Sequence, residues 1–350
     1  MCVLFASCLK DVSRAMRVWL NPAWQLESAG STVTFQGEKK KYVLDDSKGV
    51  VSRLMAALED GCENEALKAL TSRDSDCESL VRALRKRGLL IESPSGPAGD
   101  DSIHARQWGH LALHTPRPDE AQRRICDATV MVMGVGGTGS VILQHLIGAG
   151  VRRFVLVDTD NVQLNNLNRQ FTFPRAAVGE PKLDASQSYI RDRVSDAEVS
   201  LVDRFVTSSA DIEELLEAHT DVDVIAVCID QPIGSISDAV SESAWGRDVP
   251  SIFGGVGMQR GFYGPLFAPG KSTVTPERLA FSARADDAGS TADSGDLRST
   301  RYSFGPHNTI IGAWMAASII HHIAGITELV DYDVRKIIDF ETGRITAQTR

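Results

Sequence analysis

The feature that most constrains this chain is a glycine-rich turn that directly follows a short apolar run. Residues 129–133 (Thr-Val-Met-Val-Met) are typical of a strand buried on both faces of a parallel sheet. Gly134, Gly136 and Gly139 follow with G-x-G-x-x-G spacing, and Gly137 adds a further glycine. Glycines let the backbone come close to a phosphate, and the helix that begins there supplies free N–H groups. The pattern predicts a nucleotide-binding turn.

An acidic residue at the end of the next expected strand supports this interpretation. Asp158 is placed to accept hydrogen bonds from a ribose. Spacing and ribose contact fit NAD and ATP equally well, so these two features leave the nucleotide open. The alternative without a ligand is a glycine turn that only packs a helix on a strand.

The segments after the glycine turn alternate between strand and helix patterns, which is the signature of an α/β, Rossmann-like doubly wound sheet. The turn is followed by a helix that ends near Gly148. The next expected elements are a strand at 153–158, a helix at 182–193, a strand at 198–202, a helix at 210–219, a strand at 222–228, a helix at 235–245 and a strand at 250–253. Beyond these we expect an antiparallel strand at 260–267, a polar loop at 283–300, an apolar helix at 308–324 and two short strands within 335–346.

The first 91 residues have a different pattern. Short strands are expected within residues 15–45, and helices from about residue 50, at 62–71 and at 76–87. A β-ribbon with three helices resembles a winged helix. Residues 92–101 have the composition of a linker. The expected organisation is therefore a module at 1–91, a segment at 92–124 that begins with the linker, and a nucleotide-binding domain at 125–350.

Composition excludes several classes of function. The net charge is −9, and no long basic stretch is present, which argues against nucleic acid as a partner. The apolar stretch at 310–326 is shorter than a membrane span and contains two histidines, and no secretory signal is recognisable. The six cysteines are scattered without a CxxC pair, which favours a reducing cytoplasm and argues against a zinc site.

Downstream motifs resemble those of the ThiF/MoeB/ubiquitin-activating (E1)-like adenylating family. The Asp-x-Asp at 158–160 is followed by Asn-Asn-Leu-Asn-Arg-Gln at 165–170, Gly-x-x-Lys at 179–182 and Cys-Ile-Asp at 228–230. The resemblance covers about residues 104–327. It implies ATP as the nucleotide, Mg²⁺ as the metal ion and a homodimer as the assembly.

The resemblance also implies roles for individual residues. Arg169 and Lys182 would contact the triphosphate, Asp230 would hold Mg²⁺ and Asp158 the ribose. Two further residues would line the nucleotide pocket, Asp160 and Asn166. Arg106 resembles an arginine that reaches across the dimer into the partner's site, which implies that residues 92–124 are a linker and dimer-crossing segment.

Each of these residues also has a structural alternative. Arg169 could form a surface ion pair, Lys182 could be an exposed lysine at a helix start, and Asp230 could cap a helix before Pro232. Arg106 could be an ordinary surface arginine.

The chain departs from the family pattern in its cysteines. Many members bind zinc through two CxxC pairs, but residues 272–277 (Ser-Thr-Val-Thr-Pro-Glu) stand where the first pair is expected. We therefore expect no structural zinc. Cys228 is expected inside a sheet strand, where it could not receive an acyl group. The acyl adenylate that an adenylating enzyme forms from a carboxyl group and ATP would therefore be attacked directly by a substrate nitrogen or another nucleophile.

The N-terminal module resembles the leader-recognition (PqqD-like, RRE) modules of enzymes that modify ribosomally made peptides. A leader would add as a strand at 40–44 and pack on the helix at 76–87, and the basic clusters at 39–41 and 85–87 would suit an acidic leader. The layout resembles the microcin C adenylating enzyme and, without zinc, more closely the pantocin-type peptide cyclase. The implied reaction is adenylation of a peptide carboxyl, from a glutamate side chain, followed by cyclodehydration.

Other functions stay open at this point. Within the adenylating class, the enzyme could activate a peptide C-terminus and form an N–P bond, or act on a ubiquitin-like carrier protein. From other classes, an NAD(P)-dependent oxidoreductase and a non-catalytic peptide-binding partner are the alternatives. The basic clusters could be solvated faces, and the N-terminal module could serve only dimer contacts.

Overall fold

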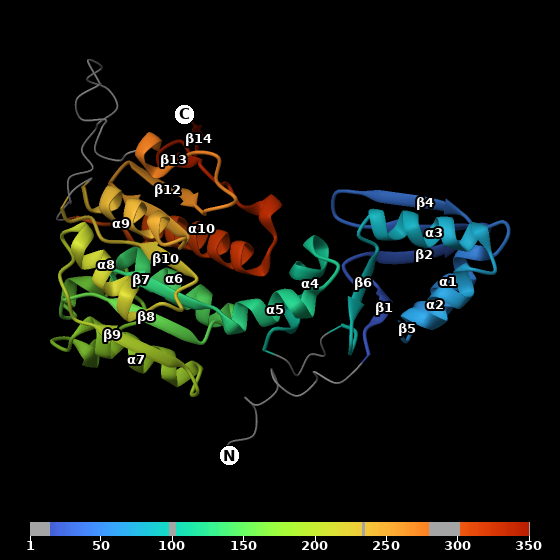
Figure 1. Cartoon of the computed structure of the whole chain (residues 1–350), viewed down its shortest axis with the longest axis horizontal. Coiled ribbons are helices and arrows are strands. Elements are labelled where there is room, and N and C mark those ends of the chain that lie inside the picture. The colour runs from blue at the N-terminus through green and yellow to red at the C-terminus, as the bar shows by residue number, and fades with distance from the viewer. Residues whose placement is uncertain (1–14, 98–102, 233–234, 280–301, 350) are drawn as a thin grey trace. The chain divides into compact units, whose positions relative to one another are not determined.

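The computed structural model describes residues 15–97, 103–232, 235–279 and 302–349. The chain divides into two compact units, residues 1–124 and 125–350 (Figure 1). No helix within the described residues has the length and hydrophobicity needed to cross a membrane.

The N-terminal unit contains two three-stranded antiparallel sheets and four helices among its described residues, apart from the helix that spans the boundary at residue 124. One sheet has the order β5-β1-β6 and the other the order β2-β3-β4. The elements are β1 (Arg17–Leu20), β2 (Gln25–Ala29), β3 (Thr32–Gln36), β4 (Lys41–Asp45), α1 (Val50–Leu58), β5 (Cys62–Glu63), α2 (Asn64–Thr71), α3 (Ser75–Lys86), β6 (Leu90–Ser93) and α4 (Ala105–His114). Short strands were expected within residues 15–45, where β1 to β4 lie, and the first three helices were predicted. β5, β6 and α4 were missed, and β6 extends into the segment expected to be a linker.

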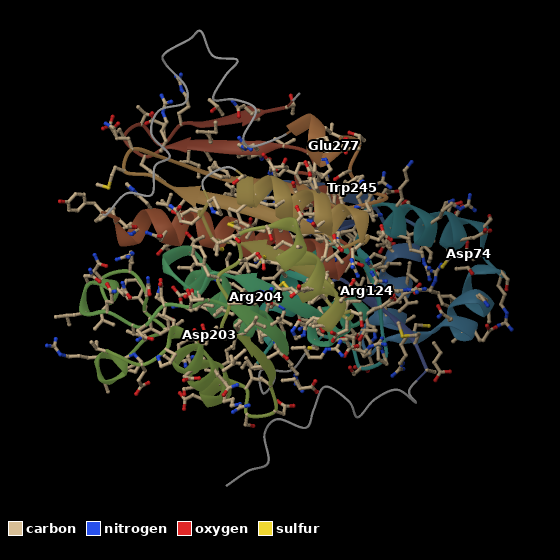
Figure 2. All side chains as sticks on the ribbon, turned by 60° about the vertical axis from the view of Figure 1, so that its left-hand side comes forward. Asp74, Arg124, Asp203, Arg204, Trp245 and Glu277 are labelled. Carbon is tan, nitrogen blue, oxygen red and sulfur yellow. The ribbon has the colours of Figure 1, made fainter. Side chains whose placement is uncertain are left out.

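The alternation in β3 builds the core of this unit. Val33 and Phe35 are buried and pack with apolar side chains of α1 and α3, among them Leu54 and Leu84. Asp74, labelled in Figure 2, precedes α3. Its side chain accepts hydrogen bonds from two backbone N–H groups of the first turn, as expected of an N-cap.

Helix α4 is tied to the same unit by a buried amide. Asn21 is buried, and its Nδ2 donates to the backbone oxygens of Gly88 at 2.8 Å and Ala112 at 2.6 Å. Trp108 and Ala112 of α4 also pack against Ile91 of β6. The end of β1, the turn after α3 and helix α4 therefore form one connected piece.

The second unit is built on an eight-stranded sheet with the order β14-β13-β12-β11-β10-β7-β8-β9. Strands β11, β10, β7, β8 and β9 run parallel, and β12, β13 and β14 extend the sheet with antiparallel pairs. The strands are β7 (Thr129–Met133), β8 (Arg153–Val157), β9 (Glu198–Val202), β10 (Val224–Val227), β11 (Ser251–Val256), β12 (Arg260–Phe267), β13 (Arg335–Asp339) and β14 (Ile345–Gln348). The helices are α5 (Pro118–Asp127), which spans the boundary between the units, α6 (Gly137–Ala149), α7 (Lys182–Arg193), α8 (Ser209–Ala218), α9 (Ser235–Gly246) and α10 (Gly305–Ala324).

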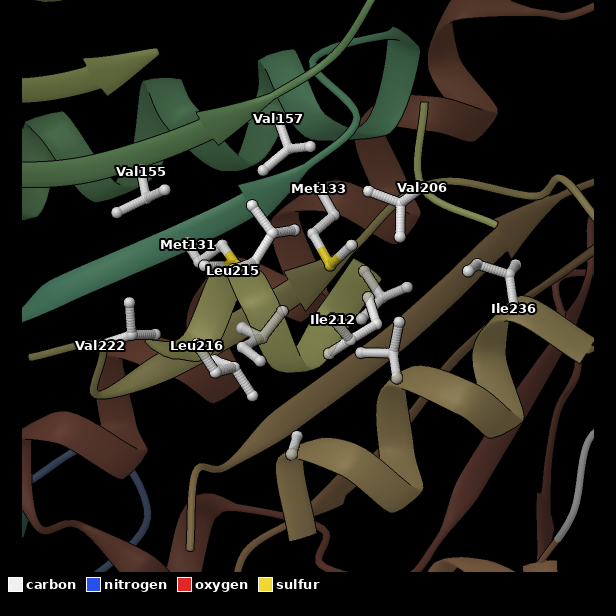
Figure 3. Packing of buried hydrophobic residues seen from close by; sticks show 14 of the residues in the cluster. Met131, Met133, Val155, Val157, Val206, Ile212, Leu215, Leu216, Val222 and Ile236 are labelled. Atoms are coloured by element: carbon white, nitrogen blue, oxygen red, sulfur yellow. The ribbon is translucent and has the colours of Figure 1, made fainter. Parts of the chain in front are cut away.

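Helices cover both faces of this sheet. Met131 and Met133 of β7 face a cluster that includes Leu215 of α8 and Ile236 of α9 (Figure 3). Because side chains alternate along a strand, Val130 and Val132 point to the opposite face, where α6 and α10 pack against each other. This confirms the Rossmann-like, doubly wound sheet predicted from the apolar runs.

The strand order places a topological switch point beside β7. The chain continues from β7 to β8 on one side of it, and β10 pairs with β7 on the other side. Ligands of open α/β sheets bind outside the carboxyl ends of the strands at such a point. The glycine turn after β7 lies at this position.

Most of the predicted elements of this unit are present with small shifts at their ends. Residues 182–193 and 260–267 have the predicted bounds as α7 and β12. Helix α10 begins at Gly305 instead of residue 308, because a proline is compatible with the first turn of a helix. The polar loop predicted at 283–300 lies outside the described residues.

Candidate functional site

Gly134 must be a glycine for two reasons. Its φ of 89° lies in the left-handed region, which side chains rarely adopt. A Cβ at this position would also lie 2.9 Å from the backbone oxygen of Cys228, just after β10. The glycine turn therefore passes close to the segment that carries Asp230.

The carboxylate of Asp158 joins the glycine turn to the segment after β8. Its Oδ2 accepts a hydrogen bond from the Val135 N–H at 2.8 Å, and its Oδ1 accepts one from the Asp160 N–H at 2.9 Å. Each carboxylate oxygen has two lone pairs, so Asp158 retains the capacity to accept from ribose hydroxyls. The role at the ribose stays a prediction.

Lys182 is the first residue of α7, and its side chain is almost completely buried. The ammonium Nζ lies 2.7 Å from Oδ2 of Asp160, whose side chain is mostly exposed. The backbone N–H of Lys182 also donates to the backbone oxygen of Asp160 at 2.9 Å. The alternative of an exposed lysine at a helix start is therefore wrong.

Arg169 presents a half-buried guanidinium. Its Nη1 donates to the Asn165 backbone oxygen at 2.8 Å and to Oδ1 of Asn168 at 3.0 Å. Burial lowers the pKa of Arg169 from its usual range. Within the described residues its hydrogen-bond partners are neutral and it forms no salt bridge, so the alternative of a surface ion pair is not supported. A cation held by neutral groups retains charge for an anionic ligand.

Two amide side chains complete the segment around Arg169. Oδ1 of buried Asn166 accepts the Gln163 N–H at 2.9 Å, which fixes the turn between them. Gln170 is 2% exposed, and its Oε1 has no hydrogen-bond partner among the described residues. A Cβ on Gly136 would lie 3.7 Å from Nε2 of Gln170, so this amide faces the glycine turn.

These side chains line a pocket of about 630 Å³, a volume that accommodates a small-molecule ligand. Its ionisable lining groups include two cations and one carboxylate. The lining residues are Asp160, Asn161, Gln163, Asn165, Asn166, Asn168, Arg169, Gln170, Lys182, Tyr302 and Ser303.

The pocket gathers some of the predicted site residues and not others. Asp160, Asn166, Arg169 and Lys182 line it together. The four glycines of the turn, Asp158 and Asp230 are not among the lining residues. Sequence motifs missed Gln163, Tyr302 and Ser303, which carried no pattern of their own, whereas Asn165, Asn168 and Gln170 stood in the Asn-Asn-Leu-Asn-Arg-Gln motif without an assigned role.

Asp230 is an exposed carboxylate that follows β10 by three residues. No group of three histidine, cysteine or acidic residues in the described part of the chain could hold a metal ion by itself. Mg²⁺ in nucleotide sites uses one or two carboxylates together with substrate phosphates, so a single carboxylate fits that ion. The metal role of Asp230 stays a prediction.

Cys228 lies just after β10 and not inside the strand, which corrects the expected boundary. Its side chain is partly buried, and burial raises the pKa of the thiol to about 12. A thiol with this pKa is protonated at neutral pH, and the thiolate is the nucleophilic form. Cys228 is therefore poorly suited to receive an acyl group.

Arg106 lies in the first turn of α4, in the N-terminal unit, with an exposed side chain. The structure holds one copy of the chain, and the predicted reach of Arg106 into a partner's site stays a prediction.

Comparison with known proteins agrees with this geometry. A model of the ThiF family matches residues 109–348. This chain belongs to the ThiF family. Among curated proteins, it is 32% identical over 111 residues to the sulfur carrier protein ThiS adenylyltransferase of Escherichia coli (strain K12), a stretch that is 32% of this chain and 43% of that protein. The resemblance to the ThiF/MoeB/E1-like family is thereby confirmed.

Other matches support the family and the fold. The tRNA threonylcarbamoyladenosine dehydratase of Bacillus subtilis (strain 168) is 39% identical over 88 residues, 25% of this chain and 35% of that protein. In both curated relatives the matched stretch spans less than half of their length. The crystal structure of E. coli MccB has a TM-score of 0.74 at 22% identity and covers 95% of this chain and 94% of that one. At this identity the likeness shows a shared fold.

Proposed function

We propose that this chain is an ATP- and Mg²⁺-dependent enzyme that adenylates a carboxyl group on a ribosomally made precursor peptide. The observation that carries the proposal is the pocket that brings Arg169 and buried Lys182 together, with its lining residue Gln170 facing the glycine turn. A dinucleotide needs the turn and an acid for its ribose, but a triphosphate also needs cations near its β- and γ-phosphates. The pocket supplies two.

The proposed first step activates a poor acyl donor. A carboxylate oxygen of the peptide attacks the α-phosphorus of ATP, the bond from that phosphorus to the bridging oxygen breaks, and pyrophosphate leaves with the electron pair. The product is an acyl adenylate. Charge develops on pyrophosphate, so the cations Arg169 and Lys182 stabilise the transition state more than a base would.

The remaining site residues hold the nucleotide in this proposal. Asp158 accepts from the ribose hydroxyls, and Asp160 and Asn166 shape the pocket beside them. Mg²⁺, when bound to Asp230 and the phosphates, neutralises phosphate charge. Arg106 enters the site of a partner subunit in a homodimer.

The second step in the proposal is direct attack by an amide nitrogen of the peptide on the acyl carbon. The C–N bond forms, the carboxyl oxygen leaves with AMP, and the nitrogen loses its proton, so the peptide has lost one water overall. The high pKa of the Cys228 thiol argues against a thioester on that residue. A glutamate side chain is the proposed carboxyl group.

The N-terminal unit offers an edge for the leader of such a peptide. β4 is an edge strand of the β2-β3-β4 sheet, and Val43 on it is 57% exposed. Arg87, which follows α3, lies over the ring of Tyr42 at 5.5 Å, so α3 borders this edge. A peptide strand added to β4 would gain main-chain hydrogen bonds and contact α3. In this proposal the unit is the winged-helix-like recognition module.

Only part of the positive charge near this edge is available to bind an acidic leader. Arg85 already pairs with Glu92 at 3.0 Å, so it contributes less to an acidic leader than its position in the sequence suggested. Lys40 and Lys41 form no salt bridge within the described residues. We therefore assign the attraction for an acidic leader to these lysines.

Known structures support the peptide proposal by analogy. Structures of E. coli MccB have been solved with ATP and, for the microcin C7 biosynthetic enzyme MccB, with N-formylated MccA. PaaA has the same fold at a TM-score of 0.69 and 19% identity, and the match covers 93% of this chain and 98% of that one.

The test is isotope exchange between pyrophosphate and ATP with the full chain and candidate precursor peptides. Exchange that depends on an added peptide supports the proposal, and loss of exchange when the glutamates are changed to glutamine assigns the carboxyl. Exchange that occurs only with a ubiquitin-like carrier protein would show that the enzyme adenylates a carrier protein and not a precursor peptide. Binding of NADH without binding of ATP would refute the adenylating function.

The leader site has its own test. The double variant Lys40→Glu, Lys41→Glu should weaken binding of an acidic leader peptide, with a smaller effect at high salt because screening reduces charge attraction. Lys68→Glu is the control, because Lys68 lies on α2 and pairs with Glu65. Equal affinities in both variants would contradict the leader assignment.

A further inference from the structure

Asn308, in the first turn of α10, connects two walls of the candidate site. Its side chain is 5% exposed. Nδ2 donates to Oγ of Ser303, a lining residue of the pocket, at 2.8 Å and to the backbone oxygen of Phe304 at 2.9 Å. The amide nitrogen therefore fixes the position of residues 303 and 304, which lead into α10.

The other side of the same amide lies against the glycine turn. A Cβ added to Gly137 would collide with Oδ1 of Asn308 and would lie 2.8 Å from its Cγ. Oδ1 also lies 3.5 Å from the hydroxyl oxygen of Thr138, which donates to it. Asn308 thus fills the space that a side chain at position 137 would need.

Backbone conformation does not explain a glycine at position 137. Gly134 has a positive φ, whereas Gly137 does not and is the first residue of α6. An alanine is therefore compatible with the backbone there, and the obstacle is the Asn308 side chain.

The first turn of α10 also meets the segment that carries the arginine. A Cβ on Gly305 would lie 2.8 Å from the backbone oxygen of Asn168 and 3.6 Å from Cα of Arg169. One helical turn therefore touches both the glycine turn and the Arg169 segment. In the proposed function these two parts bind the same triphosphate.

We propose that Asn308 is a positioning residue that sets the separation between the glycine turn and the Arg169 segment, and that position 137 is glycine to admit its amide. The inference rests on ATP being the nucleotide, as proposed above. Asn308 acts through the turn and through Ser303 and does not itself contact the nucleotide.

The test compares ATP affinity in full-length variants by calorimetry, which needs no peptide. Gly137→Ala is expected to weaken ATP binding by roughly tenfold to a hundredfold, because small displacements of positioned groups have effects of this size. Asn308→Ala should also weaken it, since Ser303 loses its tether. The double variant Gly137→Ala, Asn308→Ala should bind ATP more tightly than Gly137→Ala alone, because the collision is removed.

Gly148→Ala is the matched control. Gly148 lies in α6, the helix that begins at Gly137, and a Cβ there would meet nothing within 4 Å. It should bind ATP like the unaltered protein. Thermal unfolding without nucleotide should show all variants folded.

Three results would overturn the inference. Unchanged ATP affinity in Gly137→Ala would show that the amide does not constrain the turn. A double variant that binds no better than Gly137→Ala would remove the link between the two residues. Failure of the unaltered protein to bind ATP would refute the proposed function together with this inference, whereas the first two results leave that function intact.

Discussion

The ammonium group of Lys182 and the carboxylate of Asp160 form an ion pair with one buried and one exposed end. Nζ and Oδ2 are 2.7 Å apart, and the side chains are 7% and 68% exposed. A buried ammonium needs a negative partner, because desolvation of an unpaired charge is costly. Asp160 supplies that partner in the absence of nucleotide, and a phosphate oxygen could take over part of this role.

The first prediction concerns Asp160→Asn. The variant leaves Lys182 without its carboxylate and should lower the free energy of unfolding by about 1.5 to 3 kcal/mol, the range measured for hydrogen bonds to charged groups. Denaturant unfolding measures this. Asp184→Asn, an exposed neighbour on α7, is the control. Equal stabilities of the two variants would show that the pair contributes nothing.

The second prediction concerns Lys182→Met, which keeps the apolar stem and removes the charge. We expect peptide-dependent kcat to fall by about a hundredfold to a thousandfold, the range seen when one group that stabilises transition-state charge is removed. Lys271→Ala, an exposed lysine, serves as the control for net charge. Turnover by the methionine variant at the rate of the control would exclude Lys182 from the triphosphate.

The third prediction concerns Arg169. Arg169→Ala should weaken ATP binding and lower kcat, and Arg169→Lys should recover only part of the loss, because lysine lacks the planar fork that binds phosphate in two places. Steady-state kinetics with varied ATP measures both effects. Arg175→Ala, an exposed arginine of the short helix at 175–177, should behave like the unaltered enzyme. Full activity in Arg169→Lys would argue for a simple charge role.

The fourth prediction concerns Cys228. Cys228→Ser should retain adenylation and turnover, since a thiol with a pKa of about 12 holds only about one thiolate in ten thousand at pH 8. Alkylation of Cys228 by iodoacetamide should be much slower in folded than in denatured protein. A covalent peptide thioester that disappears in the serine variant would contradict direct attack on the adenylate.

The same thiol makes stability depend on pH. Its pKa is raised from 9.0 to about 12 on folding, so the folded state keeps the proton while the unfolded chain releases it. This contribution to stability is complete below pH 9 and is lost as the pH rises from about 9 to 12. Cys228→Ser should show a shallower decline of the unfolding free energy over that range.

The fifth prediction concerns Asp211 at the start of α8. Its carboxylate accepts hydrogen bonds from the Thr207 N–H and the Ser208 side chain, and these bonds lower its pKa to about 2. Arg204, labelled in Figure 2, lies 2.9 Å from the same carboxylate. Because the pKa of Asp211 is lower in the folded than in the unfolded state, its charge stabilises the folded state fully at pH values above 3.8. This contribution is lost as the pH falls toward 2.

Asp211→Asn should therefore lower the thermal unfolding temperature at pH 7, and the difference from the unaltered protein should shrink as the pH falls below 4. Calorimetry at several pH values measures this. Glu242→Gln, an exposed acid on α9, is the control. A difference that stays constant with pH would show that the charge of Asp211 is not the cause.

Much of the second unit could be predicted from periodicity because its strands are continuous apolar runs. β7 is buried at every position, and α7 and β12 have the predicted bounds. β5 and β6 were missed because their pairing partner, β1, lies far away in the sequence and no local pattern reports that pairing.

The pocket was predictable where its lining residues stand in motifs that resemble those of the family. Arg169 and Lys182 were singled out through that resemblance, and both line the pocket. Tyr302 and Ser303 were missed because they enter the pocket only through the packing of α10 against α6. The role of Asn308 could not be read from spacing, since it depends on a contact between residues 137 and 308.

The amide of Asn21, which holds α4 to the end of β1 and to the turn after α3, determines how this protein can be recombined with its relatives. Arg106 lies on α4, so in a hybrid protein it would be exchanged together with β4 and not with the pocket. A chimaera joined after residue 97 would exchange one without the other and cut through the anchored piece. A junction between α4 and α5, near residue 116, would transfer β4 and this arginine together without interrupting either helix, and should yield better folded hybrids.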